Sequence, residues 1–177
     1  MTDVRNDTYT FRPIGIIHTP FREPEGMPIQ GALVPETEGR IEIFPEFAQG
    51  LQDIDGFSHL ILLYVFHRSQ GYRLICKPFL EETARGLFAI RAPRRPNPIG
   101  MTVVRLLRRR DNRLDIAGVD MIDGTPLLDI KPYMPSIDAH GDAQEGWSSG
   151  RMATDGKKTL SDNRFSENQK QQGGEIT

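Results

Sequence analysis

The stretch Arg94–Gly100, of sequence RRPNPIG, contains the side chains best suited to bind or position a ligand. Two prolines fix φ on either side of Asn97, and each proline also biases the residue before it toward extended backbone. The loop is therefore predicted to be stiff and non-helical. It presents a carboxamide and two guanidinium groups, and Arg91 lies three positions upstream. A rigid, polar loop of this kind indicates a preorganised edge of a ligand site.

Two histidines bracket the most apolar segment of the chain. His59 and His67 are separated by an even number of residues, so they lie on the same face of a predicted strand. The strand between them spans about 26 Å, which is far too long for both to bind one metal ion. His59 follows Ser58 at the start of the strand and is typical of a hydrogen-bonded structural group. His67 lies where the strand ends, a position that suits ligand contact and structural roles equally.

Three aspartates, Asp120, Asp123 and Asp129, surround a predicted turn late in the folded region. Asp120 and Asp123 could accept hydrogen bonds from ligand hydroxyls or attract a cation. Ordinary Asp-Gly turn chemistry explains Asp123 equally well, and pairing with Lys131 or an arginine explains Asp129. The residues alone leave these alternatives open.

Length and composition predict one folded domain with polar ends. The chain has 177 residues, of which 37% are hydrophobic, and large apolar side chains become sparse after Ser136. We therefore expect a folded core at residues 9–148, a flexible N-terminus at residues 1–8 and a disordered polar tail at residues 149–177.

Charge does not by itself indicate a nucleic-acid partner, because the formal net charge is −2. However, nine arginines fall between residues 85 and 113 and could form a local basic face. The alternative is that arginines such as Arg108–Arg110 are solvated ends of a hairpin, where cations oppose aggregation.

Several classes of site are excluded by what the chain lacks. Cys76 is the single cysteine, which excludes an intrachain disulfide and a cysteine-based zinc site and is typical of a reducing compartment. No dinucleotide-binding, Walker or HExxH motif is present, so neither a nucleotide-binding α/β sheet nor a metal site is predicted. The longest apolar run, Leu60–Phe66, is too short to span a membrane, and no signal peptide opens the chain. We expect a cytoplasmic protein.

Short apolar runs between turn residues predict a mostly antiparallel β domain, either a barrel or a sandwich. Its central strand is Phe57–His67, which is apolar on both faces and is expected to be covered on both. Asp111 and Asn112 tolerate positive φ and predict a hairpin, Pro45–Leu51 predicts a short helical turn, and residues 20–38 form a long, functional or mobile loop. The other predicted strands are Tyr9–Thr19, Gly39–Phe44, Leu74–Leu80, Gly86–Ala92, Thr102–Leu107, Leu114–Val119 and Leu127–Ile130.

Several of these blocks occur in the order typical of one protein family. They are Pro13–Phe21, Pro28–Gln30, Phe57–Leu60, Arg94–Gly100, Asp120–Pro126 and Asp129–Tyr133. Over about residues 11–137 the chain resembles the TsaA-like family, also called TrmO. Its members are tRNA methyltransferases that use S-adenosylmethionine to methylate the N6 nitrogen of N6-threonylcarbamoyladenosine, next to the anticodon of a threonine tRNA. The RPNPIG block together with the DGTP and DIKPY blocks makes this resemblance highly specific.

The resemblance implies a single-sheeted antiparallel β-barrel with short helical turns that works as a homodimer. His67, Asp120 or Asp123 is expected to remove the proton from the acceptor nitrogen. Arg91, Arg94 and Arg95 suit the threonyl carboxylate or tRNA phosphates, because a guanidinium binds both in a fork. By similarity, the methyl donor is expected to contact Pro28, Ile29, Gln30, His67, Arg68, Arg91, Met101, Asp120, Met121, Ile122 and Asp123, to which the rigid loop adds Asn97.

Two other functions remain open on the same barrel: methylation of a small molecule, and binding of S-adenosylmethionine without catalysis. The first is favoured by the mild net charge and by a polar tail where many bacterial members carry a second domain.

Overall fold

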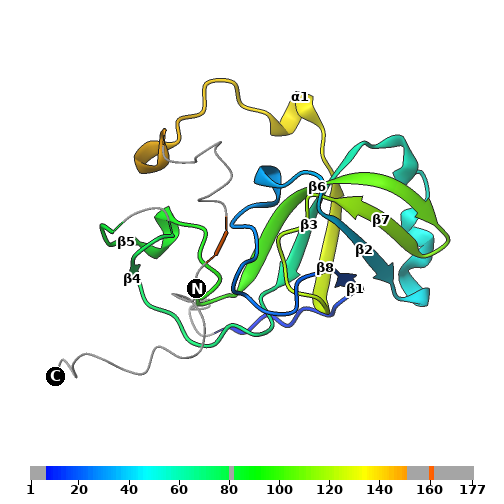
Figure 1. Cartoon of the computed structure of the whole chain (residues 1–177). Coiled ribbons are helices and arrows are strands. Elements are labelled where there is room, and N and C mark those ends of the chain that lie inside the picture. Colours follow the sequence, from blue (N-terminus) through cyan, green and yellow to red (C-terminus); the bar gives the residue numbers. More distant parts are fainter. Residues whose placement is uncertain (1–6, 80–81, 151–159, 162–177) are drawn as a thin grey trace.

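Six antiparallel strands close into a barrel (Figure 1) in a computed structural model that describes residues 7–79, 82–150 and 160–161. Around the barrel the order is β1-β2-β7-β6-β3-β8, and β8 pairs again with β1. The strands are β1 (Gly15–His18), β2 (Glu38–Ile43), β3 (His59–Val65), β6 (Ile99–Arg110), β7 (Arg113–Ala117) and β8 (Thr125–Pro132). The prediction of a mostly β, single-sheeted antiparallel barrel is confirmed.

A smaller lobe lies beside the barrel and consists of the two-stranded sheet β4 (Ile75–Cys76) and β5 (Arg85–Gly86) with the segment that follows it (Figure 1). The helices of the described residues are short, and none is long and apolar enough to cross a membrane. They are the 3-10 helices η2 (Gly31–Leu33), η3 (Pro45–Leu51), η4 (Ile54–Gly56), η5 (Leu87–Ala89) and η6 (Gly146–Ser148), and the α-helix α1 (Pro135–Asp138).

The hydrophobic core fills the inside of the barrel. Successive side chains of each strand point alternately into and out of the barrel, so every second residue faces this core. In β3, Leu60, Leu62 and Tyr64 are buried, whereas the alternate residues on the outer face are only half-buried. The expected cover on both faces of this strand is therefore present on the inner face alone. The other fully buried aliphatic side chains of this core are Ile17, Ile41, Ile43, Val104, Leu114, Ile116, Val119 and Leu127.

The hairpin predicted at Asp111 and Asn112 is confirmed, because β6 and β7 pair on either side of these residues and Asp111 has φ of 53°. Asn112 donates from its side chain to the carbonyl of Ile43 at 2.6 Å, which ties the turn to β2. The helical turn predicted at Pro45–Leu51 is also confirmed as η3.

Some strand predictions differ from the structure. Among the described residues of the strand predicted at Leu74–Leu80, only Ile75 and Cys76 pair, as β4. The strand predicted at Gly86–Ala92 is wrong, since a 3-10 helix follows β5 there. Its apolar residues Leu87 and Ile90 lie three positions apart and, with Ala92, are buried in a separate cluster rather than on a sheet. A spacing of three matches one 3-10 turn. The first strand is also shorter than predicted, because pairing with β2 begins only at Gly15.

Two late segments contact the rest of the folded region, one at the end of the predicted core and one within the predicted polar tail. In the first, Trp147 donates from its indole nitrogen to the carbonyl of Ala89 at 2.7 Å. Further on, Leu160 and Ser161 lie antiparallel to the segment around Pro28, with the backbone N–H of Ser161 donating to Met27 O at 2.7 Å. Residues 1–6, 151–159 and 162–177, where flexibility and disorder were predicted, lie outside the described residues.

Gly100 offers a test of how tightly the mouth of the barrel is packed. It lies opposite Tyr64 in the β3–β6 pair, and a Cβ added there would overlap the Tyr64 ring. We expect Gly100→Ala to lower the free energy of unfolding by about 1–3 kcal/mol, the usual cost of overpacking. Urea denaturation would measure it. Gly86→Ala is the control, because nothing lies near its added methyl group, and a loss equal to that of Gly100→Ala would contradict this account.

Candidate functional site

A cavity of about 630 Å³ opens between the ends of β3 and β6, the loop before η2 and the lobe that contains η5. Ten of the twelve residues predicted to bind the methyl donor line it: Pro28, Ile29, Gln30, His67, Arg68, Arg91, Met101, Asp120, Met121 and Ile122. These residues come from five separate stretches of sequence, so the fold is what brings them together.

The other two predicted residues do not line this cavity. Asn97 is exposed, and its backbone carbonyl accepts a hydrogen bond from the N–H of Ile99 at 2.8 Å. The rigid loop still contributes to the wall, but through Arg95, Ile99 and Gly100 rather than through the carboxamide.

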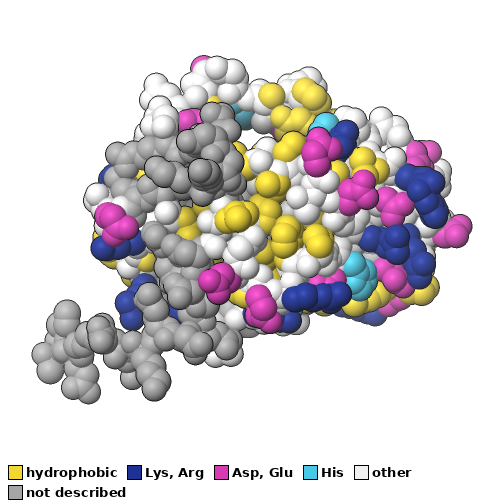
Figure 2. All heavy atoms as spheres, in the orientation of Figure 1, with side chains coloured by type: hydrophobic (Ala, Val, Ile, Leu, Met, Phe, Trp, Pro, Cys, Tyr) yellow, Lys and Arg dark blue, Asp and Glu magenta, His cyan; other side chains and the backbone are white. Residues whose placement is uncertain are grey.

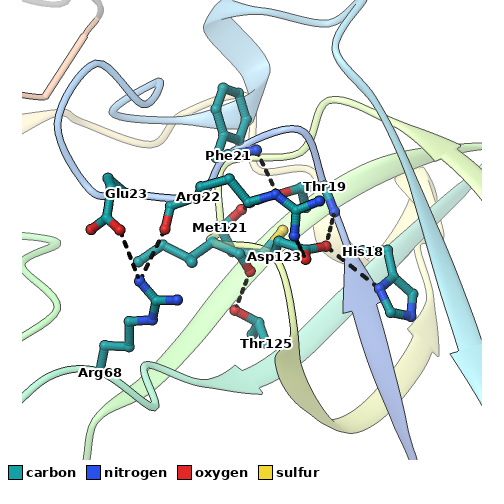
Figure 3. Close-up of polar contacts among 10 residues, drawn as sticks. His18, Thr19, Phe21, Arg22, Glu23, Arg68, Met121, Asp123 and Thr125 are labelled. Carbon is teal, nitrogen blue, oxygen red and sulfur yellow. Dashed lines mark hydrogen bonds and ion pairs between the residues drawn. The ribbon is translucent and has the colours of Figure 1, made fainter.

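Asp123 follows Ile122 in the turn before β8, but its carboxylate lies outside the cavity lining. It forms an ion pair with Arg22 and accepts a hydrogen bond from the backbone N–H of Thr19 at 3.1 Å (Figure 3). His18 approaches the same carboxylate at 3.5 Å. These contacts hold the segment after β1 against the segment before β8. The turn interpretation of Asp123 therefore describes its surroundings better than a place beside a ligand in the cavity.

Asp120 is 8% exposed and joins three parts of the structure at the bottom of the cavity. One carboxylate oxygen accepts the hydroxyl of Thr102 at 2.6 Å, with the hydroxyl of Tyr64 at 3.4 Å. The other oxygen accepts the backbone N–H of Gly31 at 2.8 Å. Burial raises the pKa of this carboxyl, although the three hydrogen bonds act in the opposite direction.

Tyr64 and Thr102 were not predicted as site residues. Their hydroxyls lie 3.0 Å apart, and Tyr64 lines the cavity. Burial and the charge of Asp120 raise the pKa of Tyr64, so its hydroxyl stays protonated. A signal existed in the sequence, because both residues occupy inward positions in strands whose other inward residues are Leu60, Leu62 and Val104. A polar group at such a position needs a partner.

The loop between β1 and η2 is fastened to the rest of the cavity wall at several points. Arg68 donates to the carbonyl of Arg22 at 2.9 Å and lies 3.6 Å from the carboxylate of Glu23 (Figure 3). Arg91 donates to the side-chain oxygen of Gln30 at 2.7 Å, which connects the lobe to the same loop. Long loops are mobile by default, so these contacts are what give this wall a defined shape.

His67 lies two residues after the end of β3, and its exposed side chain lines the cavity. Partial burial and the positive charge of Arg68 lower the pKa of its imidazole below the ordinary value of 6.5. The ring is therefore neutral at pH 7 and able to accept a proton. No other histidine lines the cavity among the described residues.

Arg95, one of the arginines predicted to bind an anion, is occupied with the protein backbone. It donates to the carbonyls of Leu87 and Ile90 at 3.3 and 3.0 Å, and its guanidinium lies 5.7 Å from the centre of the Phe88 ring. These contacts close the lobe against the rigid loop. Arg91 remains the exposed guanidinium of this part of the wall.

Comparison with known proteins identifies relatives across this region. The family model of the tRNA-methyltransferase O N-terminal domain matches residues 16–139. A probable S-adenosyl-L-methionine-binding protein of Pyrococcus abyssi is 54% identical over 137 residues, which cover 77% of this chain and 74% of that protein. The tRNA (adenine(37)-N6)-methyltransferase of Escherichia coli is 35% identical over 158 residues, 84% of this chain and 67% of that enzyme.

Among solved structures, the crystal structure of TrmO from Pseudomonas aeruginosa is similar with a TM-score of 0.68 and 39% sequence identity. The match covers 80% of this chain and 63% of that one. The chain thus spans somewhat less than two thirds of the length of this structural relative.

The raised pKa of Asp120 predicts a pH dependence of stability. The folded protein holds this proton more tightly than the unfolded chain does, so the contribution to stability is fully present below pH 3.8 and is lost as the pH rises through the folded pKa. Asp120→Asn cannot titrate at this position. We therefore expect the unfolding free energy of the wild type, minus that of the variant, to fall as the pH rises above the unfolded pKa of 3.8. A difference that rose over this range would mean that the hydrogen bonds to the carboxylate outweigh its burial.

Proposed function

This chain belongs to the family of the tRNA-methyltransferase O N-terminal domain, and we propose that it methylates the N6 nitrogen of N6-threonylcarbamoyladenosine beside the anticodon of a tRNA. Threonine tRNA is the proposed substrate and S-adenosylmethionine the proposed methyl donor. The observation that supports this most directly is the convergence of ten predicted donor-binding residues on one cavity.

The cavity suits a nucleoside with an amino-acid tail. Its volume of about 630 Å³ falls in the range of small-molecule sites. The apolar side chains of Ile29, Met101 and Ile122 offer surfaces for a purine ring, and the guanidinium of Arg91 suits a carboxylate. When bound, the donor supplies an electrophilic methyl group on a positively charged sulfur.

We assign the removal of the acceptor proton to His67. Its imidazole lines the cavity, and the lowered pKa leaves it neutral and able to accept a proton at physiological pH. Asp120 is less suited because its carboxylate is buried and already accepts three hydrogen bonds. Asp123 lies outside the cavity lining and pairs with Arg22.

Positioning is the second contribution of this chain to the proposed reaction. A methyl transfer gains most of its acceleration from holding two reactants in line. The contacts of Arg68 with the loop backbone and of Arg91 with Gln30 hold the loop between β1 and η2 in place as one wall of the cavity. A donor sulfonium loses its positive charge during transfer, so an enzyme that bound this charge strongly would slow the reaction. The arginines of the cavity wall are themselves positively charged and would not bind it.

A homodimer is part of the proposal. On the outer face of the barrel, Ile99, Met101 and Val103 of β6 are 40%, 51% and 37% exposed. They pair with Val65, Leu63 and Ile61 of β3, whose side chains are half-buried. This apolar strip runs out from the cavity, since Ile99 and Met101 also line it. A second copy of the chain is the partner that we propose to cover it. For the assembled enzyme we propose a cytoplasmic location, which the single cysteine agrees with.

Transfer of a labelled methyl group tests the proposed function. We expect the purified protein, given methyl-labelled S-adenosylmethionine and bulk tRNA from a strain that lacks this methylation, to label threonine tRNA. Nuclease digestion should then release the label as the N6-methylated nucleoside. Donor binding without label in any tRNA would support instead a small-molecule methyltransferase or a binding module.

The same assay tests His67. We expect His67→Gln to lower kcat by about 100-fold or more, the usual effect of losing a general base, while the protein still binds the donor. In the wild type, kcat/KM should fall as the pH drops through the lowered pKa of His67, below 6.5, and the variant should lack this limb. His59→Gln is the matched control, because His59 lies at the opposite end of β3 and bonds to Ser58 at 2.9 Å. Equal activity of the wild type and His67→Gln would exclude the assignment.

The oligomeric proposal is tested by a charge in the apolar strip. We expect Val103→Asp to convert a dimer into a monomer, because the new carboxylate would be desolvated in the interface. Light scattering coupled to size-exclusion chromatography would measure the mass. Val103→Thr keeps the shape of the side chain and should remain dimeric. A wild-type protein that is monomeric at micromolar concentration would contradict the proposal.

A further inference from the structure

A second hollow, of about 940 Å³, lies on the outer face of the barrel across β1, β2, β7 and β6. Its lining includes four arginines and two aspartates: Arg22, Arg40, Arg108, Arg110, Asp115 and Asp123. We call this surface the arginine groove. Figure 2 shows basic and acidic side chains gathered over the part of the barrel where β1, β2 and β7 lie in Figure 1.

One carboxylate serves three guanidinium groups in the centre of the arginine groove. Asp115 lies 3.2 Å from Arg40, 3.6 Å from Arg108 and 3.8 Å from Arg110. Burial acts against the ionised form, but the hydrogen bond from Arg40 and the charges of Arg110 and Arg108 outweigh it and lower the pKa of Asp115. A single negative charge leaves this cluster with an excess of two positive charges. Each guanidinium has five N–H donors, so donors remain for another anion.

The three arginines of the run Arg108–Arg110 have two different roles. Arg109 donates to the backbone carbonyls of Leu51 at 2.9 Å and Asp111 at 3.1 Å, so it holds the hairpin in place. Arg108 and Arg110 are about 60% exposed at the side chain and face Asp115 instead. Solvated hairpin ends need no such convergence on one acid.

The groove begins where the cavity ends. Arg22 and Asp123 line the groove, while their chain neighbours Glu23 and Ile122 line the cavity. Two short segments, held together by the Arg22–Asp123 ion pair (Figure 3), therefore form the ridge between the two hollows. A base bound in the cavity would leave its flanking phosphates near this ridge.

The length of the groove suits a nucleic-acid strand. From His18 the register runs to Arg40 and Asp115 and then to Arg108, which is three steps between neighbouring strands. At roughly 4.8 Å a step the groove is about 14 Å long. A stacked strand rises about 3.4 Å for each nucleotide, so about four nucleotides would cover the groove.

We propose that the arginine groove binds the sugar–phosphate backbone of the tRNA next to the base that enters the cavity. This inference rests on the proposed function, since it assumes a tRNA as the substrate. Forked guanidinium groups match phosphate oxygens, and contacts of this kind orient an RNA without reading its sequence. Glu38 and His18 also line the groove, at its β1–β2 end. The carboxylate of Glu38 makes the excess of positive charge smaller at that end than at the Asp115 cluster.

The double variant Arg108→Ala/Arg110→Ala tests the proposal with threonine tRNA transcript as the probe. Fluorescence anisotropy at several salt concentrations would give both the Kd and its salt dependence. We expect roughly tenfold weaker binding, and a slope of log K against log salt smaller by about 1.4, which corresponds to two lost single-strand phosphate contacts. Affinity for S-adenosylmethionine, measured by calorimetry, should not change, which would show that the variant is folded.

Arg12→Ala is the matched control. Arg12 is an exposed arginine with one acidic partner, Glu46 at 2.7 Å, and lies beyond the opposite end of β1 from His18. Its loss should leave the Kd and slope unchanged. If the double variant kept both the affinity and the salt slope of the wild type, the groove would not contact the tRNA and would suit an acidic protein instead. If the wild type itself neither bound nor methylated tRNA, the proposed function would fail as well.

Discussion

The hydrogen bonds of the Asp120 carboxylate are the interaction on which the cavity depends. They join β3 through Tyr64, β6 through Thr102 and the long loop through the backbone of Gly31. The loop can come this close only because residue 31 is glycine, since a Cβ there would overlap the carbonyl of Gly118. Without this carboxylate, the backbone N–H of Gly31 would lose its acceptor, and the hydroxyls of Tyr64 and Thr102 could pair only with each other, which is costly in an apolar barrel. One side chain thus sets the distance between the barrel and the wall of the site.

The same arrangement separates the tasks of the charged residues around the cavity. Buried and fully bonded, Asp120 contributes shape, whereas exposed His67 contributes a group that can take up a proton. Arg68 acts twice, because it fastens the loop and its charge adds to the effect of burial in lowering the pKa of His67. Asp123 and Arg22 form a boundary beyond which the surface becomes a chain of arginines around Asp115. Chemistry and the proposed RNA contacts therefore occupy neighbouring but distinct surfaces.

Much of this could be predicted from the sequence, and the reasons for success and failure are physical. The apolar run of β3 and the turn residues Asp111 and Asn112 are local signals. They predicted the strand and the β6–β7 hairpin correctly, although among the described residues the cover expected on the outer face of β3 is absent. Ten of the residues that the family resemblance predicts to bind the donor line one cavity. Tyr64 and Thr102 were missed because a polar residue among inward-facing aliphatic ones becomes meaningful only when its partner across the barrel is known. Gly86–Ala92 was misread because a short apolar run suits a strand and a 3-10 turn alike.

Leu160 and Ser161 pair with the loop segment at Met27 and Pro28. This pairing affects the shape of the cavity rim but not the pairing of the barrel strands. Every strand of the closed barrel already has two neighbours, so the barrel needs nothing from this late segment. Ser161 nevertheless lines the cavity. A substitution at Leu160 or Ser161 can therefore change the rim of the cavity at little cost to the folding of the barrel.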